Sequence, residues 1–184
     1  AVLTGVHLGG WGRDLPGRER LPGLLRRCLA ALPDLRLRLS SIHPDEVGPD
    51  LLAVLAAEPR LRPHLHLSLQ SGADSVLRRM RRPYTAADAR RALAAVAALG
   101  DHWGIGADLI AGFPGETDAE FRELMAFAKA IEFDPAGCFT YSLQQWTGAF
   151  EMADQVPDEV KHERRDRFMR QQMKIAAKRA RRFV

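Results

Sequence analysis

The chain has 184 residues, of which 46% are hydrophobic and 27% are charged, and its formal net charge is +4 at pH 7. This composition excludes intrinsic disorder and is typical of one globular unit with a sizeable core. No segment approaches the roughly 18 consecutive apolar residues of a membrane span, and no basic-then-apolar leader is evident, so we expect a cytoplasmic protein without a membrane partner.

Five short segments have the pattern of β-strands, and each is preceded or followed by a longer helical pattern. They are residues 2–8, 35–41, 64–70, 104–111 and 137–142. Their first residues lie 33, 29, 40 and 33 positions apart, about the length of a β-α-β crossover unit. The spacing predicts an α/β fold with a parallel sheet or barrel and disfavours a β-sandwich.

Two of the helical patterns have a single apolar face. Apolar residues recur at helical spacing at Leu24, Leu25, Cys28, Leu29 and Leu32, and again at Phe121, Leu124, Met125 and Ala128. Thr117 and Asp118 have the pattern of a helix N-cap with Glu120 in the first turn, and Thr85 with Asp88 has the spacing of a capping box. We therefore expect helices that cover the sheet with one face.

Two of the strands alternate apolar and polar residues. In HLHLSLQ (64–70) the leucines share one face, and the histidines, Ser68 and Gln70 share the other; LRLRLSS (35–41) alternates similarly. Because buried parallel strands are usually apolar throughout, a polar face on interior strands predicts a lumen or cleft that holds a polar ligand. An antiparallel sheet with one solvated face remains the alternative.

The loops after the strands are rich in glycine, serine, glutamine and carboxylates, and ligand sites form at the carboxyl ends of parallel strands. In the first loop, Gly9 and Gly10 allow close approach of the backbone to a ligand, or form an ordinary turn. His43 has the alternatives of base, ligand or plain turn residue. Glu46 can likewise be a helix N-terminal charge.

The stretch DLIAGFPGET (108–117) passes from an apolar strand into a glycine-rich turn. Gly112 and Gly115 allow the chain to turn sharply, and Pro114 fixes that turn. Glu116 then either accepts hydrogen bonds from a ligand or binds the backbone N–H groups of its own loop. A purely structural turn stays open as an interpretation.

The end of the chain is strongly basic. Residues 161–184 contain ten Lys and Arg against Glu163 and Asp166, a net charge of +8, so residues 1–160 sum to −4. A basic helix of this kind either binds phosphate groups of a nucleic acid or is a solvated helix in an Arg-rich chain.

Four segments carry a family resemblance: LTGVHLGGWGRDL, LRLSSIHPDEV, LHLSLQSGADSVLRRMRRPYT and DLIAGFPGETDAEF. In this order they resemble the radical S-adenosylmethionine (SAM) methylthiotransferases. TGVHLG and LSSIHPDE look most like the tRNA enzymes that modify N6-threonylcarbamoyladenosine beside the anticodon. FDPAGCFTYS and DQVPDEVKHERRDRFMRQQ instead resemble the branch that methylthiolates an aspartate of a small-subunit ribosomal protein.

The resemblance implies a partial (β/α) barrel of parallel strands with outer helices over residues 1–157, lacking the first βα unit. A long basic helix at 158–184 would lead to an RNA-binding domain. In this family a [4Fe–4S] cluster cleaves SAM to a 5′-deoxyadenosyl radical that abstracts a substrate hydrogen. Sulfur is then inserted, and a second SAM supplies the methyl group. The implied partner is tRNA or a ribosomal protein, and the full-length enzyme is expected to be a monomer.

The resemblance also implies site residues, although it assigns none to catalysis. The SAM-binding set is Gly9, Gly10, Ser41, Glu46, Gln70, Ser71, Asp108, Gly112, Glu116, Tyr141 and Ser142. The set for the substrate or RNA is Arg79, Arg82, Lys174, Lys178 and Arg179, with solvent-facing helix charges as the alternative for Arg79 or Arg82.

Two features depart from the family. Its C-x3-C-x2-C loop, which holds the cluster, is not in this sequence, and Cys28 and Cys138 have the settings of small buried hydrophobic residues. No metal ligand is therefore assigned. We expect that the chain is a fragment or a degenerate copy of such an enzyme and that it is inactive in isolation. A non-catalytic RNA-binding remnant and an unrelated α/β barrel with Glu116 as general base are the other hypotheses.

Overall fold

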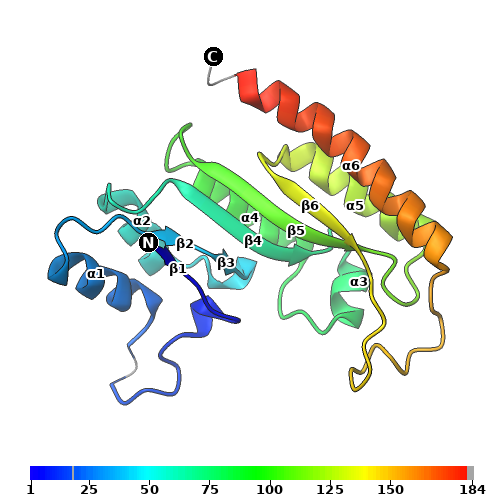
Figure 1. Cartoon of the computed structure of the whole chain (residues 1–184), viewed down its shortest axis with the longest axis horizontal. Helices are drawn as coiled ribbons and strands as arrows, with labels where there is room; N and C mark the ends of the chain where they lie inside the picture. The colour runs from blue at the N-terminus through cyan, green and yellow to red at the C-terminus, as the bar shows by residue number, and fades with distance from the viewer. Residues whose placement is uncertain (18, 182–184) are drawn as a thin grey trace. The chain divides into compact units, whose positions relative to one another are not determined.

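A computed structural model of the chain describes residues 1–17 and 19–181. Figure 1 shows the helices and strands along the chain. In order they are β1 (Val2–Leu3), the 3-10 helix η1 (Leu8–Gly10), α1 (Leu21–Ala31), β2 (Arg38–Leu39), β3 (Ser41–Ile42), the 3-10 helix η2 (Pro44–Glu46), α2 (Pro49–Ala57), β4 (His64–Gln70), α3 (Asp74–Arg79), α4 (Ala86–Ala97), β5 (Gly104–Ala111), α5 (Asp118–Ile131), β6 (Ala136–Thr140) and α6 (Asp158–Ala180).

The strands form two sheets. β1 pairs with β2, and β3, β4, β5 and β6 are neighbours in that order in a four-stranded sheet. The pairings β1–β2, β3–β4 and β5–β6 are parallel, which confirms the predicted α/β class with parallel strands. Within the described residues neither sheet closes on itself, so the barrel is partial.

Two strands coincide with their predicted ranges, and three do not. β4 and β5 occupy 64–70 and 104–111 as expected, whereas β6 covers 136–140 rather than 137–142. The predicted strand 2–8 was wrong beyond Leu3, because the chain turns before Leu8 and η1 begins there. The predicted strand 35–41 is divided into two-residue strands that pair with different partners.

The polar alternation of β4 is confirmed. Leu65, Leu67 and Leu69 are fully buried, while the histidines, Ser68 and Gln70 between them are half-buried. β4 therefore has one face in the core and one that reaches partial solvent, as its period of two predicts.

The chain divides into two compact units, residues 1–68 with 88–106, and residues 69–87 with 107–184. In the first unit α1 packs on α2. Leu25 and Leu29 of the predicted stripe are buried together with Leu21, but Leu32 is exposed because α1 ends at Ala31.

In the second unit, α6 packs on β6 and on α5, and Figure 1 shows these three elements side by side. α5 begins with the predicted capping box: Thr117 accepts from the backbone of Glu120, and the Glu120 carboxylate accepts from the backbone of Thr117. Its buried face consists of Phe121, Leu124, Phe127 and Ala128. Met125 of the predicted stripe is only half-buried.

The predicted C-terminal basic helix corresponds to α6, which begins at Asp158; its last predicted residues, 182–184, lie outside the described part. A domain boundary between residues 157 and 158 stays a prediction. None of the described helices combines the length and the apolarity that crossing a membrane requires.

Candidate cofactor site

The turn between β5 and α5 is held by its own carboxylate. Gly112 and Gly115 have φ angles of 76° and 73°, a left-handed conformation that favours glycine. The Gly112 N–H donates to Glu116 Oε1 at 2.9 Å, and the Glu116 N–H donates to the carbonyl of Phe113 at 2.8 Å. Of the two uses predicted for Glu116, the structure shows the bond to the loop backbone.

Glu116 is also paired with Arg164 of α6, which donates from Nη1 to Oε1 at 3.0 Å. Burial removes water from this carboxyl and raises its pKa, an effect that the Gly112 N–H and Arg164 partly oppose. The second oxygen, Oε2, is buried and has no partner among the described residues. A contact of Glu116 with SAM stays a prediction, and Oε2 is the atom that remains for it.

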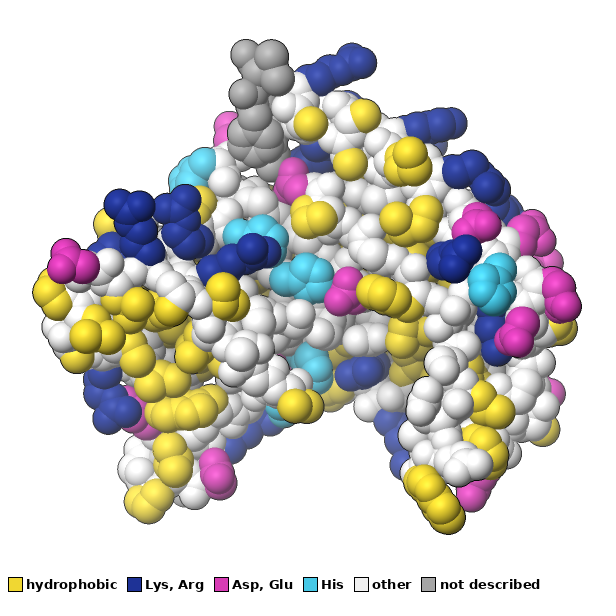
Figure 2. All heavy atoms as spheres, viewed as in Figure 1, with side chains coloured by type: hydrophobic (Ala, Val, Ile, Leu, Met, Phe, Trp, Pro, Cys, Tyr) yellow, Lys and Arg dark blue, Asp and Glu magenta, His cyan; other side chains and the backbone are white. Residues whose placement is uncertain are grey.

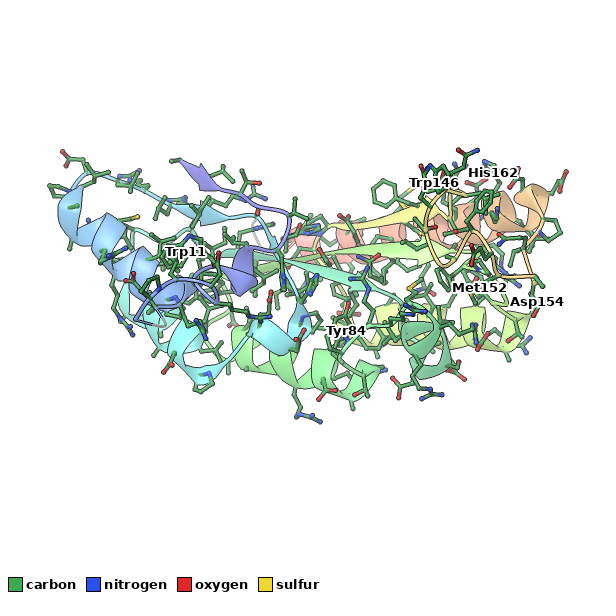
Figure 3. All side chains as sticks on the ribbon, turned by 90° about the horizontal axis from the view of Figure 1, so that it is seen from below. Trp11, Tyr84, Trp146, Met152, Asp154 and His162 are labelled. Carbon is green, nitrogen blue, oxygen red and sulfur yellow. The ribbon has the colours of Figure 1, made fainter. Side chains whose placement is uncertain are left out.

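A cavity of about 420 Å³ lies in the second unit, beside the ends of β5 and β6. Ile110 and Phe113 line it from β5 and the following turn, and Tyr141 lines it directly after β6. The remaining lining residues come from the α3 end and from the loop after β6, and they are Arg79, Met80, Arg81, Arg82, Gly148, Ala149 and Met152. Figure 3 shows Met152 on that loop, together with Trp146 and Asp154.

Three polar atoms of residues that line this cavity are buried without a hydrogen bond. The hydroxyl of Tyr141, Nε of Arg79 and Nε of Arg82 have no partner among the residues that the structure describes. The Tyr141 ring meets Phe113 edge-on at 5.3 Å, and Lys161 Nζ lies 5.7 Å from its centre. Because an unpaired buried polar group costs about 1–3 kcal/mol, these groups favour a polar ligand that would bond to them.

The other predicted residues of this unit do not line the cavity. Gln70 ends β4 at a φ of 65°, and buried Ser71 accepts from the Ala73 N–H at 3.2 Å. Asp108 lies opposite Gly137 in the β5–β6 register. Ser142 lines a neighbouring hollow together with Tyr141. Their contact with SAM stays a prediction.

Arg79 is occupied by an ion pair. Its Nη1 and Nη2 donate to the two oxygens of Glu120 at 2.8 and 2.9 Å. This hydrogen bond is the main reason why the pKa of Glu120 falls to about 2. Arg79 thus neutralises a carboxylate of the chain itself and ties α3 to the first turn of α5, while its contact with substrate or RNA stays a prediction.

In the first unit, Gly9 and Glu46 are brought together. A Cβ atom at Gly9 would overlap the Glu46 carboxylate. Ser41 forms its hydrogen bond with another residue: its Oγ pairs with Nδ1 of His66 at 3.0 Å. His7, which contacts Glu46, was missed as a site residue because the predicted strand ran through residue 8, whereas β1 ends at Leu3 and leaves His7 in the loop that follows.

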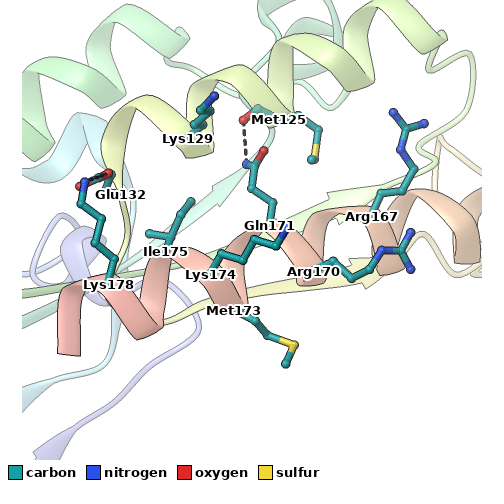
Figure 4. A pocket seen from close by; sticks show the side chains of 10 residues that line it. All are labelled: Met125, Lys129, Glu132, Arg167, Arg170, Gln171, Met173, Lys174, Ile175 and Lys178. Carbon is teal, nitrogen blue, oxygen red and sulfur yellow. Dashed lines mark hydrogen bonds and ion pairs between the residues drawn. The ribbon is translucent and has the colours of Figure 1, made fainter. Parts of the chain in front are cut away.

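A groove of about 760 Å³ runs along the surface where α5 and α6 pack together (Figure 4). Its cations are Lys129, Arg167, Arg170, Lys174 and Lys178, and Figure 2 shows Lys and Arg side chains gathered along α6. Lys178 pairs with Glu132 at 2.5 Å, and Arg167 lies 3.7 Å from Glu163. Within residues 1–17 and 19–181, no carboxylate is in ion-pair distance of the other three.

The predicted RNA contacts are therefore not equivalent. Lys174 faces the groove without an ion pair, Lys178 is paired, and Arg179 donates to Asp134 at 2.9 Å outside the groove lining. Lys129 and Arg170, which sequence reasoning did not single out, complete the unpaired set. Only the packing of α5 against α6 places Lys129 beside the basic helix.

A family model decides the wider relationship: the model of the radical SAM superfamily matches residues 3–128. The chain belongs to the radical SAM superfamily. The solved structure of the radical SAM enzyme coproporphyrinogen III oxidase (HemN) from Escherichia coli shares this fold. It aligns with a TM-score of 0.69 and 19% identity, over 84% of this chain and 37% of that one.

The predicted resemblance to methylthiotransferases is confirmed by curated relatives. Threonylcarbamoyladenosine tRNA methylthiotransferase MtaB of Thermotoga maritima is 39% identical over 90% of this chain and 38% of its own length. Ribosomal protein uS12 methylthiotransferase RimO of Anaeromyxobacter sp. is 41% identical over 95% and 37%. tRNA-2-methylthio-N(6)-dimethylallyladenosine synthase of Caldicellulosiruptor saccharolyticus is 35% identical over 96% and 38%. The chain thus spans less than two-fifths of the length of these relatives.

The two cofactors of the radical SAM superfamily fit this chain differently. Cys28 lies half-buried on α1, and Cys138 is buried in β6 with its pKa raised to about 12 by that burial. An iron–sulfur cluster binds to thiolates, so the described residues do not provide its ligands. The cavity beside β6 has polar atoms suited to a ligand such as SAM, because the Tyr141 hydroxyl and Nε of Arg79 and Arg82 lack partners among the described residues.

Proposed function

We propose that this chain is the SAM-binding part of a radical SAM methylthiotransferase that adds a methylthio group to a tRNA adenosine next to the anticodon. The observation that carries the proposal is the 420 Å³ cavity with three buried polar atoms that have no partner among the described residues, in a chain of this superfamily. The relatives support a transferase, which would act in the cytoplasm as a monomer.

SAM, when bound, supplies the adenosyl radical and the methyl group of this reaction type. The residues of the chain bind and orient it. The Tyr141 hydroxyl and Arg82 Nε would donate hydrogen bonds to polar atoms of the bound SAM, and the ring of Phe113 would provide an apolar wall. Because Glu116 holds the turn beside them, this wall is formed before the ligand arrives. Without cluster ligands in this chain, we propose that it is inactive in isolation.

Binding of SAM to the chain tests this proposal. Calorimetric titration with SAM should give saturable binding that Tyr141→Phe weakens about tenfold, because one buried hydrogen bond is worth about 1.4 kcal/mol. Tyr84→Phe is the matched control, since the Tyr84 hydroxyl is bonded to the carbonyl of Leu69 at 3.4 Å and lies outside the cavity lining. Absence of saturable binding, or equal effects of both variants, would refute the assignment of the cavity.

The groove between α5 and α6 favours tRNA over the alternative substrate, an aspartate of a ribosomal protein. Arg167, Arg170, Lys174 and Lys178 follow one another at i, i+3, i+7 and i+11, a stripe of about 16 Å on one helix face. Three groove cations that have no ion pair among the described residues provide a surface for RNA phosphates.

Salt-dependent RNA binding tests the substrate. The triple variant Lys129→Gln/Arg170→Gln/Lys174→Gln should weaken tRNA binding and reduce the salt slope by about 2. The control Arg26→Gln/Arg62→Gln/Arg78→Gln removes the same charge from exposed positions outside the groove and should change binding less. If both triple variants weaken tRNA binding equally, net charge alone is responsible for the binding. The groove then no longer favours tRNA over the ribosomal-protein substrate.

A further inference from the structure

Two histidines and a carboxylate meet in the loops that follow β1 and β3. His7 lies directly before η1, while His43 and Glu46 begin and end the segment that contains η2. One potential ligand atom of each residue lies within 4.8 Å of those of the other two. The rings of His7 and His43 are stacked with their centres 4.9 Å apart, and His7 Nε2 contacts Glu46 Oε1.

The backbone around this cluster is shaped to admit the three side chains. A Cβ at Gly9 would overlap the Glu46 carboxylate, and a Cβ at Gly10 would lie 2.8 Å from Nδ1 of His7. The absence of a Cβ at these two glycines makes room for the cluster's own side chains, while the predicted approach of their backbone to SAM stays a prediction. Gly9 and Gly10 therefore leave space for the Glu46 carboxylate and the His7 imidazole, respectively.

The carboxylate is oriented by the loop. The His43 N–H donates to Glu46 Oε2 at 3.1 Å, which leaves Oε1 directed at His7. The Glu46 side chain is 4% exposed and that of His7 is 45% exposed, so the cluster is anchored on the buried side and open to solvent on the other. Arg13 Nη2 lies 3.3 Å from the same Oε1.

We propose that His7, His43 and Glu46 bind a divalent transition-metal ion such as Zn²⁺, Fe²⁺ or Co²⁺. Two imidazoles and one carboxylate are a donor set that these ions accept with coordination positions left open. Metal–ligand bonds of about 2.0–2.2 Å place ligand atoms about 3.3 Å apart, which is about 1.5 Å less than the 4.8 Å within which the three ligand atoms now lie. The site contains no thiolate and is therefore distinct from an iron–sulfur site.

Two neighbouring contacts change when the metal binds. His43 also caps η2 together with Glu46, so coordination by this ring replaces one backbone contact. Arg13 competes with the ion for Glu46 Oε1, because both are cations at the same oxygen. Removal of Arg13 should therefore strengthen metal binding, an effect that a purely structural ion-pair cluster would not produce.

Co²⁺ titration of the full 184-residue chain, followed by visible absorption, tests the site without SAM or turnover. We expect one equivalent to bind with the spectrum of a nitrogen–oxygen site, and Zn²⁺ to displace it. His7→Ala, His43→Ala and Glu46→Gln should each weaken binding more than about 100-fold, beyond the 10- to 100-fold effect of outer-shell residues. Arg13→Gln should strengthen it about three- to tenfold. His162→Ala, at an exposed histidine on α6, is the control and should leave binding unchanged.

A measurement on the unsubstituted chain keeps the proposal testable if a variant does not fold. Zn²⁺ should shift the imidazole nitrogen resonances of His7 and His43 in the nuclear magnetic resonance spectrum and leave those of His102 and His162 in place. No stoichiometric Co²⁺ spectrum, or shifts spread over all histidines, would overturn the site. Weaker metal binding in Arg13→Gln would overturn the competition at Glu46.

Discussion

Arg164 of α6 and Glu116, in the turn between β5 and α5, form an ion pair whose side chains are only 6% and 1% exposed. Arg164 Nη1 donates to both Oε1 and the backbone carbonyl of Glu116, and Nη2 donates to Asp118 at 2.6 Å. Since Oε1 also accepts from the Gly112 N–H, a single oxygen joins the turn to the helix. This arrangement depends on both charges being present.

Loss of Arg164 should destabilise the fold strongly. Arg164→Met leaves Glu116 buried without its counter-charge, and breaking a buried pair in this way costs about 3–5 kcal/mol. Urea unfolding measures the change in the free energy of unfolding. Arg165→Met is the control, because Arg165 is exposed and pairs with its neighbour Asp166, and an exposed pair contributes about 0–1 kcal/mol. Equal costs for both variants would contradict the importance of the buried pair.

Gly112 should tolerate substitution less than another glycine with a positive φ. Gly112→Ala places a side chain in the left-handed region and against Lys161 Cγ, so we expect a loss of about 3 kcal/mol from strain and overpacking together. Gly17→Ala is the control, with a φ of 87° and no atom within 4 Å of the added Cβ, and should cost about 1 kcal/mol. Thermal unfolding of the two variants gives the comparison.

Stability should fall in acid through Glu120. Its folded pKa of about 2 is depressed from 4.5, so its contribution is fully present above pH 4.5 and is lost as the pH falls toward 2. The difference in the free energy of unfolding between the native chain and Glu120→Gln should therefore be constant near neutrality and shrink over that window. Glu123→Gln, at an exposed position of the same helix, is the control for the removal of one carboxylate. A difference that stays constant down to pH 2 would disprove the assignment.

Cys138 should resist alkylation in the folded chain. Its pKa of about 12 leaves about one thiolate in 10⁴ at pH 8, and the thiolate is the reactive form. Iodoacetamide followed by mass spectrometry should modify half-buried Cys28 first. Both cysteines should react at similar rates in denaturant. Modification of Cys138 ahead of Cys28 in the native state would mean that β6 opens readily.

The parallel sheet was predictable because strand spacing and alternation are local properties of the sequence. β4 and the capping box of α5 are the clearest cases, since period two and the Thr117–Glu120 spacing each depend on a few adjacent residues. The strand 2–8 failed for the opposite reason. Its apolar residues fit a strand, but Val6 is fully exposed and the chain turns into η1.

The sites were harder to predict because they depend on distant partners. Nothing near Glu116 in the sequence indicates Arg164, which lies 48 positions away, and nothing near Lys129 indicates a shared groove with α6. His7 and Glu46 are 39 positions apart. Sequence reasoning placed reactive residue types at strand ends, but the pairing of particular atoms is set by tertiary packing.

α6 is roughly 34 Å long, and hydrogen bonds hold it at three points along its length. Arg164 bonds near its start, Gln172 donates to the carbonyl of Phe133 at 3.0 Å, and Arg179 donates to Asp134 near its end. A helix held at three points cannot rotate about one of them without straining the bonds at the other two. A tilt of α6 that separated Arg179 from Asp134 would therefore also strain the bond between Arg164 and Glu116 at the glycine turn.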